Sequence, residues 1–208
     1  MLSEELALEI LEESGALLEG HFVLTSGRHS DRYVQCAQVL RYPHYTEQLA
    51  RHLAEQFSGD RVDLVIGPAI GGIIVSYEVA RQLGAPSLFT ERVDGIMTLR
   101  RGFSIFPGQR VLVVEDVTTT GGSVREVMDV VEKHGGQVVG VGALVDRSNG
   151  RVDFGVKQRA VVTLDMRSWD PGECALCREG RIPAIKPGSR VNTGGDSPTV
   201  VEGSRGCC

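Results

Sequence analysis

Two adjacent carboxylates precede a run of hydroxyl-bearing and glycine residues near the middle of the chain. Glu115 and Asp116 are followed, after one valine, by Thr-Thr-Thr-Gly-Gly-Ser at positions 118–123. Small residues leave backbone N–H groups open to an anion, and a helix that begins there adds the positive end of its dipole. Carboxylate oxygens accept hydrogen bonds from sugar hydroxyls and are ligands that suit Mg²⁺. The segment therefore predicts a site for a ribose that carries a 5′-phosphate.

The residues on either side predict the elements that position this loop. Residues 111–114 are Val-Leu-Val-Val, which is typical of a strand buried on both faces, and residues 124–131 have helical spacing. The loop lacks the Gly-Lys-Ser/Thr of a P-loop and the Gly-x-Gly-x-x-Gly of a dinucleotide site. Many buried strands end in Asp and Gly without binding a ligand. Two adjoining acids before this hydroxyl and glycine run nevertheless favour a phosphate site over an ordinary loop.

Length and composition are typical of one soluble α/β domain with short additions. The chain has 208 residues, a formal net charge of −5 and no apolar run of membrane-spanning length. The negative charge argues against a general nucleic-acid binder, and the first residues, Met-Leu-Ser-Glu-Glu, lack the pattern of a signal peptide. We therefore expect a cytoplasmic protein that binds neither nucleic acid nor a membrane.

Strands and helices alternate over most of the chain, which predicts a parallel sheet with helices on both faces. Expected helices cover 4–18, 44–57, a segment ending at 83, and 124–131; expected strands cover 62–66, 87–90, 111–114, 138–145 and 160–164, with two short strands between 21 and 39. The stretch from about 91 to 107 has no regular pattern. Ligands bind at the carboxyl ends of parallel strands, where loops 67–72, 116–123 and 146–150 begin. We expect these loops to converge on one site.

Two of these loops offer further groups for binding anions. Gly-Pro-Ala-Ile-Gly-Gly at 67–72 is a second glycine-rich entry to a helix, whose N–H groups suit a diphosphate. Alternatively, Gly71 and Gly72 only relieve crowding between helix and sheet. Arg147 is either a solvated surface cation or a clamp for a planar carboxylate. Composition alone does not decide between these alternatives.

The stretch 91–102 contains Arg92, Arg100 and Arg101 together with two glycines. One interpretation is a β-hairpin with charged edges. The other is a mobile lid whose cations close over a diphosphate and exclude water. Both interpretations are kept at this point.

The five cysteines do not form a disulfide framework. Cys36 is isolated, Cys174 and Cys177 form one Cys-x-x-Cys, and Cys207 and Cys208 are the last two residues. One such pair is half of a zinc site, and no second pair at metal-ligand spacing is evident. Cys207 and Cys208 would complete four ligands, but from a Gly/Ser-rich tail that is expected to be mobile. We expect a plain turn at the Cys-x-x-Cys, with zinc binding as the alternative.

Several segments together resemble the orotate phosphoribosyltransferase family. Residues 111–123 resemble the phosphoribosyl-diphosphate signature of the type I phosphoribosyltransferases, although Thr118 replaces a residue that is usually aliphatic. The resemblance includes Gly-His-Phe-Val-Leu-Thr-Ser-Gly-Arg-His-Ser at 20–30 with Tyr33, loop 67–72 with Tyr-Glu-Val-Ala at 77–80, and Val-Asp-Arg at 145–147. The N-terminal segment distinguishes this family from the purine enzymes, which share the signature.

The resemblance implies a type I phosphoribosyltransferase-like parallel sheet flanked by helices. Its implied parts are an N-terminal hood over the base pocket at 1–40, an α/β core at 41–170 and a C-terminal extension with a mobile tail at 171–208. It also implies transfer of the 5-phosphoribosyl group from phosphoribosyl diphosphate to orotate, giving orotidine 5′-monophosphate and diphosphate in pyrimidine biosynthesis. Mg²⁺ is the implied cofactor, held through substrate and water, and a homodimer with a shared active site is the implied assembly.

Roles for single residues are implied by the positions that match the family. Glu115 and Asp116 would anchor the ribose hydroxyls, and Arg92 would belong to a loop that reaches the neighbouring subunit; these three are the implied catalytic residues. The implied 5′-phosphate residues are Thr119, Thr120, Gly121, Gly122 and Ser123, the diphosphate residues are Ala69, Ile70, Gly71 and Gly72, and the orotate residues are Ser26, Gly27, Tyr33, Thr119 and Arg147.

The sequence departs from the family pattern at two places. Thr25 stands where a basic residue is frequent, and the loop after Arg92 lacks the usual Lys and His. Arg100 and Arg101 either replace those cations or are simple hairpin charges. These departures affect the expected catalytic efficiency more than the expected substrate.

Two other functions fit part of the pattern. One is a phosphoribosyltransferase that accepts a purine or uracil. The other is a regulator that binds phosphoribosyl diphosphate without turning it over. Regulators built on this domain tend to carry a separate DNA-binding segment, for which one short N-terminal helix leaves no room, and an RNA-binding regulator should show a basic face.

Overall fold

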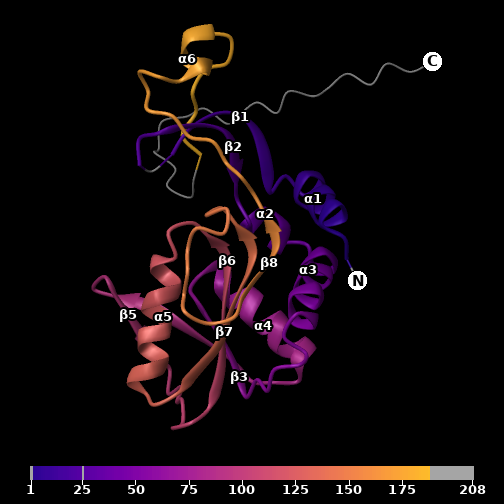
Figure 1. The fold of residues 1–208 in the computed structure, drawn as a ribbon, viewed down its shortest axis with the longest axis vertical. Coiled ribbons are helices and arrows are strands. Elements are labelled where there is room, and N and C mark those ends of the chain that lie inside the picture. The colour runs from indigo at the N-terminus through magenta and orange to yellow at the C-terminus, as the bar shows by residue number, and fades with distance from the viewer. Residues whose placement is uncertain (1, 25, 188–208) are drawn as a thin grey trace, which may run out of the picture.

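A six-stranded sheet forms the centre of the molecule in the computed structural model, which describes residues 2–24 and 26–187 (Figure 1). Its strands are β3 (Leu64–Pro68), β4 (Ser87–Val93), β5 (Ile96–Leu99), β6 (Arg110–Thr118), β7 (Gln137–Asp146) and β8 (Gln158–Thr163). They lie in the order β5-β4-β3-β6-β7-β8, and all neighbours are parallel except β4 and β5. The predicted α/β fold with a parallel sheet is confirmed.

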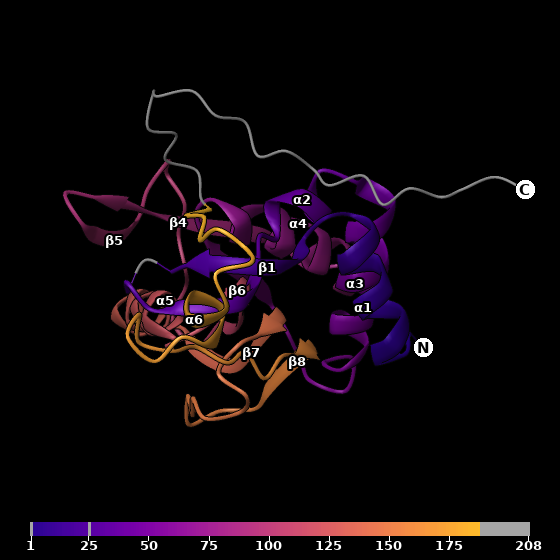
Figure 2. The same ribbon diagram turned by 90° about the horizontal axis from the view of Figure 1, so that it is seen from above.

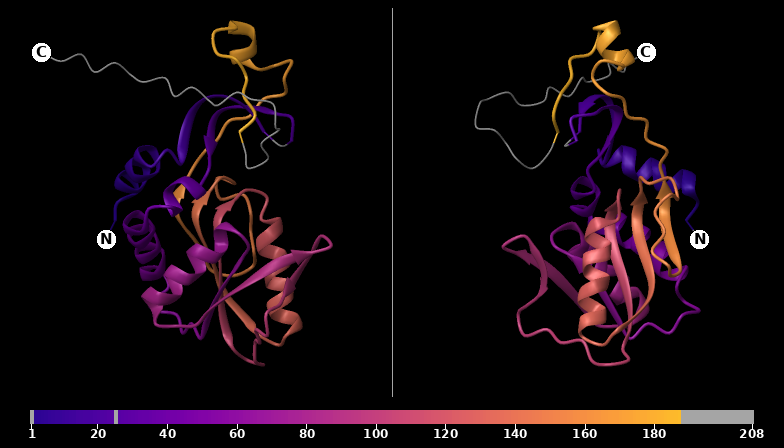
Figure 3. Two further views of the ribbon diagram at one scale, coloured as in Figure 1. Left: turned by 180° about the vertical axis from the view of Figure 1, so that it is seen from behind. Right: turned by 60° about the vertical axis from the view of Figure 1, so that its left-hand side comes forward.

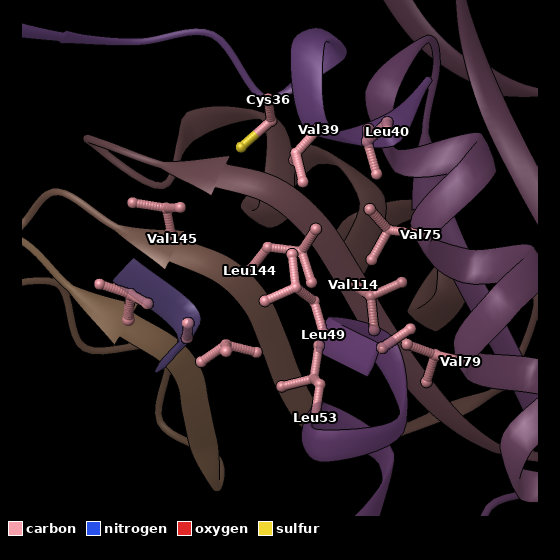
Figure 4. Close-up of a cluster of buried hydrophobic side chains, with 14 of the residues drawn as sticks. Cys36, Val39, Leu40, Leu49, Leu53, Val75, Val79, Val114, Leu144 and Val145 are labelled. Carbon is pink, nitrogen blue, oxygen red and sulfur yellow. The ribbon is translucent and has the colours of Figure 1, made fainter. Parts of the chain in front are cut away.

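Helices cover both faces of this sheet, as the alternating pattern predicted. One face packs against α1 (Glu4–Glu13), α3 (Pro43–Glu55) and α4 (Gly71–Leu83), and the other packs against α5 (Gly122–Lys133). Side chains of β6 alternate between the two: Leu112 and Val114 join the cluster of α3 and α4, whereas Val111 and Val113 join that of α5. Figure 4 shows the first cluster, with Cys36 at its upper end. None of the helices in the described part of the chain is long and apolar enough to cross a membrane.

The first helix is shorter than the one expected over 4–18, so that prediction was wrong beyond residue 13. Ser3 caps the start of α1 by accepting a hydrogen bond from the Leu6 N–H at 3.2 Å. Gly15 has a φ of 72°, which ends the helix in the left-handed conformation that glycine favours. Leu17 and Leu18 therefore belong to strand β1 (Leu17–Val23).

Strands β1 and β2 (His29–Val34) form a separate antiparallel hairpin, which we call the hood. The hood lies above the carboxyl ends of the sheet strands, and the short helix α2 (Ala37–Leu40) leads from it to the core (Figure 2). Residues 168–187, the C-terminal segment, include helix α6 (Ala175–Glu179) and run beside the hood (Figure 3).

The expected domain boundaries stay predictions. Thr25 and residues 188–208, with Cys207, Cys208 and the tail expected to be mobile, lie outside the described residues.

Residues 87–99 form a hairpin, where the sequence analysis expected a short strand followed by an irregular stretch. β4 continues to Val93 and pairs with β5. The turn consists of Asp94 and Gly95, whose φ angles of 51° and 83° match the two-residue turns that suit the twist of paired strands. Asp-Gly is a hairpin signal in the sequence itself. Of the two interpretations of this stretch, a β-hairpin or a lid, the described residues form the hairpin.

Candidate active site

The loop after β6 has the geometry of an anion cradle. β6 ends at Thr118 and α5 begins at Gly122, and Gly121 between them adopts a φ of 75°. No side chain among the described residues caps the start of α5, so its first N–H groups face outward without a side-chain partner. The hollow in front of the loop measures about 250 Å³. All five predicted phosphate residues line it, namely Thr119, Thr120, Gly121, Gly122 and Ser123.

The second glycine loop lies against the acidic pair. A Cβ atom added at Gly71 would overlap with the Asp116 carboxylate, and one added at Gly72 would come within 2.8 Å of Pro68 Cδ. The glycines therefore relieve crowding and bring backbone to the acids. Binding of a diphosphate by this loop stays a prediction. Ala69 and Ile70 are exposed beside them. The predicted convergence of the loops after β3 and β6 is confirmed.

Glu115 and Asp116 lie in different environments although they are adjacent. The Glu115 side chain is buried, with 8% of the residue exposed, and burial, followed by the charge of Asp116, raises the pKa of Glu115 to about 9. Asp116 is partly exposed, and its Oδ1 accepts a hydrogen bond from the Val117 N–H at 2.9 Å. A protonated Glu115 can both donate to and accept from a sugar hydroxyl, whereas the Asp116 oxygens accept. This asymmetry suits two ribose hydroxyls.

The raised pKa of Glu115 predicts how stability depends on pH. The folded protein keeps the Glu115 proton up to about pH 9, whereas the unfolded chain loses it near the ordinary value of 4.5. The stabilisation is therefore complete below the unfolded pKa and is lost as pH rises toward 9, by up to about 1.4 kcal/mol per pH unit. Glu115→Gln should flatten this fall in the free energy of unfolding, measured with urea on ligand-free protein from about pH 5 to about pH 8.5.

Glu55→Gln is the matched control, because Glu55 is exposed at the end of α3. This variant should follow the wild-type pH dependence. If Glu115→Gln and the wild type lose stability in parallel as pH rises, Glu115 is already ionised in the folded protein.

Arg147 lies at the carboxyl end of β7, next to the phosphate loop. Its backbone N–H donates to the Thr118 carbonyl at 2.8 Å. The side chain is partly buried, and burial lowers the pKa of the guanidinium, an effect that neighbouring Tyr33 and Cys36 partly offset. The buried Nε has no hydrogen-bond partner in the part of the chain that the structure describes. A partly desolvated cation with an orphaned N–H favours the anion clamp over the solvated surface charge.

The hood contributes the remaining residues predicted at the base. Tyr33 on β2 raises the pKa of Arg147 against the larger effect of burial, and its ring lies 5.7 Å from that of Phe22. Ser26 and Gly27 are exposed in the turn between β1 and β2, where Gly27 adopts a φ of 81°. The structure thus brings Tyr33 to Arg147, while the roles of Ser26 and Gly27 stay predictions.

Arg92 contacts α5 and the turn of its own hairpin. Its guanidinium forms an ion pair of 2.6 Å with Glu126 on α5 and donates to the Gly95 carbonyl at 3.0 Å. Arg100 and Arg101 both pair with Glu91, at 3.7 and 3.0 Å. Exposed pairs of this kind contribute about 0–1 kcal/mol, so they can open at little cost. A role of Arg92 on the diphosphate stays a prediction that requires its pair with Glu126 to break.

Two groups at this site carried no signal of a role in the sequence analysis. Cys36 is buried behind the acids, where its Sγ donates to the Asp116 carbonyl at 3.7 Å, and burial, followed by Asp116, raises the pKa of the thiol. The Oγ1 of Thr118 is buried without a partner among the described residues. Thr118 also lines a larger hollow of about 570 Å³ beside β7 and β8. Cys36 and Asp116 are 80 positions apart in sequence, so no local pattern joins them.

Comparison with known proteins agrees with this geometry. A family model described as "Phosphoribosyl transferase domain" matches residues 42–165. The chain is 64% identical over 181 residues to "Orotate phosphoribosyltransferase" of Pelotomaculum thermopropionicum, covering 87% of this chain and 95% of the relative. It is 58% identical over 192 residues to the protein of the same name from Desulforamulus reducens, covering 92% and 100%.

Solved structures extend the comparison to the fold. Orotate phosphoribosyltransferase from Aeropyrum pernix has a TM-score of 0.64 at 30% identity and covers 76% of this chain and 93% of its own. Adenine phosphoribosyltransferase from Thermoanaerobacter pseudethanolicus has a TM-score of 0.57 at 19% identity, covering 64% and 88%, and so shows the shared fold alone. With the family model over most of the core and relatives matched over nearly their full length, the chain belongs to the orotate phosphoribosyltransferase family.

Proposed function

We propose that this protein transfers the 5-phosphoribosyl group from phosphoribosyl diphosphate to orotate, giving orotidine 5′-monophosphate and diphosphate in pyrimidine biosynthesis. The observation that carries the proposal is Arg147, whose partly buried guanidinium lies beside the phosphate cradle with an Nε that has no hydrogen-bond partner among the described residues. Orotate is a planar pyrimidine with a carboxylate, and a guanidinium binds such a group through two parallel hydrogen bonds. The names of the relatives, at up to 64% identity, point to the same substrate.

The reaction follows from where the groups lie. Orotate N1 forms a bond to C1 of the ribose while the bond from C1 to the diphosphate oxygen breaks, and the sugar gains oxocarbenium character. Near neutral pH orotate carries its negative charge on the carboxylate and N1 keeps its proton. This proton leaves as the N1–C1 bond forms, and the departing diphosphate and water can accept it. The α5 cradle would hold the 5′-phosphate, Glu115 and Asp116 the ribose hydroxyls, and loop 67–72 the diphosphate. Catalysis then comes mainly from positioning and from stabilising the leaving group.

The donor set fits the Mg²⁺ that the family implies. Asp116 offers partly exposed carboxylate oxygens against the backbone of loop 67–72, and hard oxygen ligands of this kind suit Mg²⁺. We propose that substrate diphosphate and water hold the ion, with Asp116 reached through water. When bound, Mg²⁺ would supply positive charge for the departing diphosphate.

A homodimer is also part of the proposal. Ile70, Ile74 and Tyr77 are exposed large apolar side chains spaced four and three residues apart at the start of α4, and clustered exposed apolar groups mark interaction surfaces. Light scattering should give about twice the 22.5 kDa of one chain. The double variant Ile74→Glu/Tyr77→Glu should weaken dimerisation by at least about tenfold, since buried interface aromatics are frequent hot spots.

Leu6→Glu is the control for this surface, because Leu6 is exposed on α1, away from α4. It should leave the mass unchanged. A wild-type protein that stays a single chain at micromolar concentration would remove the dimer from the proposal. A cytoplasmic location stays a prediction.

The experiment that tests the function is a base-selectivity assay. Purified full-length protein with Mg²⁺ and phosphoribosyl diphosphate is mixed separately with orotate, uracil, adenine or guanine. We expect loss of orotate absorbance together with release of diphosphate. Consumption of a purine or uracil while orotate stays unchanged would favour another phosphoribosyltransferase, and binding without turnover of any base would favour a regulator.

A further inference from the structure

Two histidines and two cysteines meet between the hood and the C-terminal segment, in a cluster that the proposed reaction does not use. His21 lies on β1, His29 begins β2, and Cys174 and Cys177 lie at and within α6. One ligand atom from each side chain lies within 4.8 Å of the other three. Figures 1 and 3 show the three elements that supply them, β1, β2 and α6, in the upper part of the molecule, away from the core.

Three of the six separations in this cluster are close to those of a tetrahedral metal site. Bonds of about 2.3 Å to sulfur and about 2.0–2.1 Å to nitrogen put neighbouring ligand atoms of a Zn²⁺ tetrahedron about 3.3–3.8 Å apart. The His21 Nε2 lies 3.5 Å from Cys174 Sγ and 3.6 Å from Cys177 Sγ. His29 Nδ1 lies 3.2 Å from Cys177 Sγ. The two imidazole nitrogens are 2.8 Å apart, so an ion between them would need to widen this one edge by about half an ångström.

A hydrogen bond outside the cluster orients the imidazole of His21. His21 Nδ1 lies 3.0 Å from the Ile182 carbonyl, which can only accept, so Nδ1 carries the proton and Nε2 directs its lone pair into the cluster. Metal-binding histidines commonly use their second nitrogen in this way. His21 and His29 are buried, with 2% and 8% of each residue exposed, whereas Cys177 is exposed and leaves a path for an ion to enter.

The C-terminal segment lacks the apolar core that would otherwise hold it in place. Among the described residues from 165 to 187, Cys174 alone is buried. Backbone pairs join the segment to the hood at both edges, between Trp169 and His29 and between Ile185 and its partners His21 and Val23. A two-stranded hairpin is marginal by itself, and small units without a core commonly depend on a metal or a disulfide.

We propose that His21, His29, Cys174 and Cys177 bind one structural Zn²⁺ that fixes the C-terminal segment against the hood. Two thiolates and two neutral imidazoles balance the charge of the ion, so the complex is neutral where it is buried. The site is separate from the proposed reaction, and its test does not depend on activity. The two histidines on either side of the hood turn thus take the place of Cys207 and Cys208 as the second pair of ligands.

Metal content of the full-length protein tests the proposal. Protein purified in reductant without chelator should contain one zinc per chain by elemental analysis. Cys174→Ser and Cys177→Ser should each reduce the bound zinc by at least about tenfold after dialysis. Loss of a residue that only hydrogen-bonds to a ligand already lowers metal affinity by about 10–100-fold, and loss of a ligand itself lowers it further. Cys36→Ser and the double variant Cys207→Ser/Cys208→Ser are the controls, and both should keep the full amount.

A second measurement uses the wild-type chain alone, so the test stands even if a variant fails to fold. Co²⁺ added to metal-free protein should give the visible absorption of a tetrahedral thiolate site, and Zn²⁺ should displace it. The proposal would be overturned by wild-type protein that neither contains nor takes up zinc, by equal zinc in Cys174→Ser and wild type, or by loss of zinc in the Cys207→Ser/Cys208→Ser variant. A Cys174–Cys177 disulfide in protein prepared anaerobically would do the same.

Discussion

Replacing Gly121 with alanine is expected to lower kcat/KM by about 10²-fold, through a higher KM for phosphoribosyl diphosphate, because small misplacements of a positioning group have effects of this size. Gly121 has a φ of 75°, and a Cβ there would lie 2.7 Å from the Phe154 ring and 2.8 Å from Val152. Left-handed backbone costs a non-glycine residue about 1–2 kcal/mol, and overpacking adds about 1–3 kcal/mol. Phe154 is buried, so relief of the clash has to displace packed side chains or the loop itself, and with the loop the N–H groups predicted to bind the phosphate.

Gly84→Ala is the control for Gly121→Ala, because it introduces the same backbone strain without a steric clash. Gly84 ends α4 with a φ of 68°, and a Cβ there meets no atom of the described residues within 4 Å. It should lose about 1–2 kcal/mol of stability, measured by urea unfolding, with an unchanged KM. If Gly121→Ala keeps the wild-type KM for phosphoribosyl diphosphate, the cradle does not bind the 5′-phosphate.

The core elements could be predicted from sequence because the residues that define each of them are neighbours along the chain. The four apolar residues of β6, the acidic pair and the start of α5 are contiguous in sequence, and the predicted helix from 44 and the strand at 138–145 match α3 and β7 closely. Parallel strands present their carboxyl ends at one edge, so the topology brings loops 67–72 and 116–123 together without knowledge of any side-chain contact. The anion cradle could therefore be predicted from sequence.

Features that depend on distant contacts were not predictable in this way. Leu17 and Leu18 continue the helical spacing of the residues before them, but two adjacent leucines also fit a strand, where they point to opposite faces; only pairing with β2 decides for the strand. His21 is separated from Cys177 by 156 positions, so their meeting depends on the path of the C-terminal segment over the hood. The state of Glu115 likewise depends on burial, which its neighbours in sequence do not show.

The second large effect is expected at Arg147. Arg147→Ala should raise the KM for orotate by about 10–100-fold, since hydrogen bonds to a charged group contribute about 1.5–3 kcal/mol. The KM for phosphoribosyl diphosphate should change little, because the cradle and loop 67–72 are built from other residues. Steady-state kinetics with each substrate varied in turn measures both values.

Uracil makes this prediction specific, because it is a pyrimidine without the carboxylate. In competition with orotate, uracil should bind wild type and Arg147→Ala with nearly equal affinity, so the variant loses discrimination between the two bases rather than general affinity. Arg159→Ala is the control, since Arg159 is an exposed cation on the neighbouring strand β8; its KM values should match the wild type. Equal losses of orotate and phosphoribosyl diphosphate in Arg147→Ala would show that Arg147 supports the whole site, and would remove the main argument for a carboxylated base.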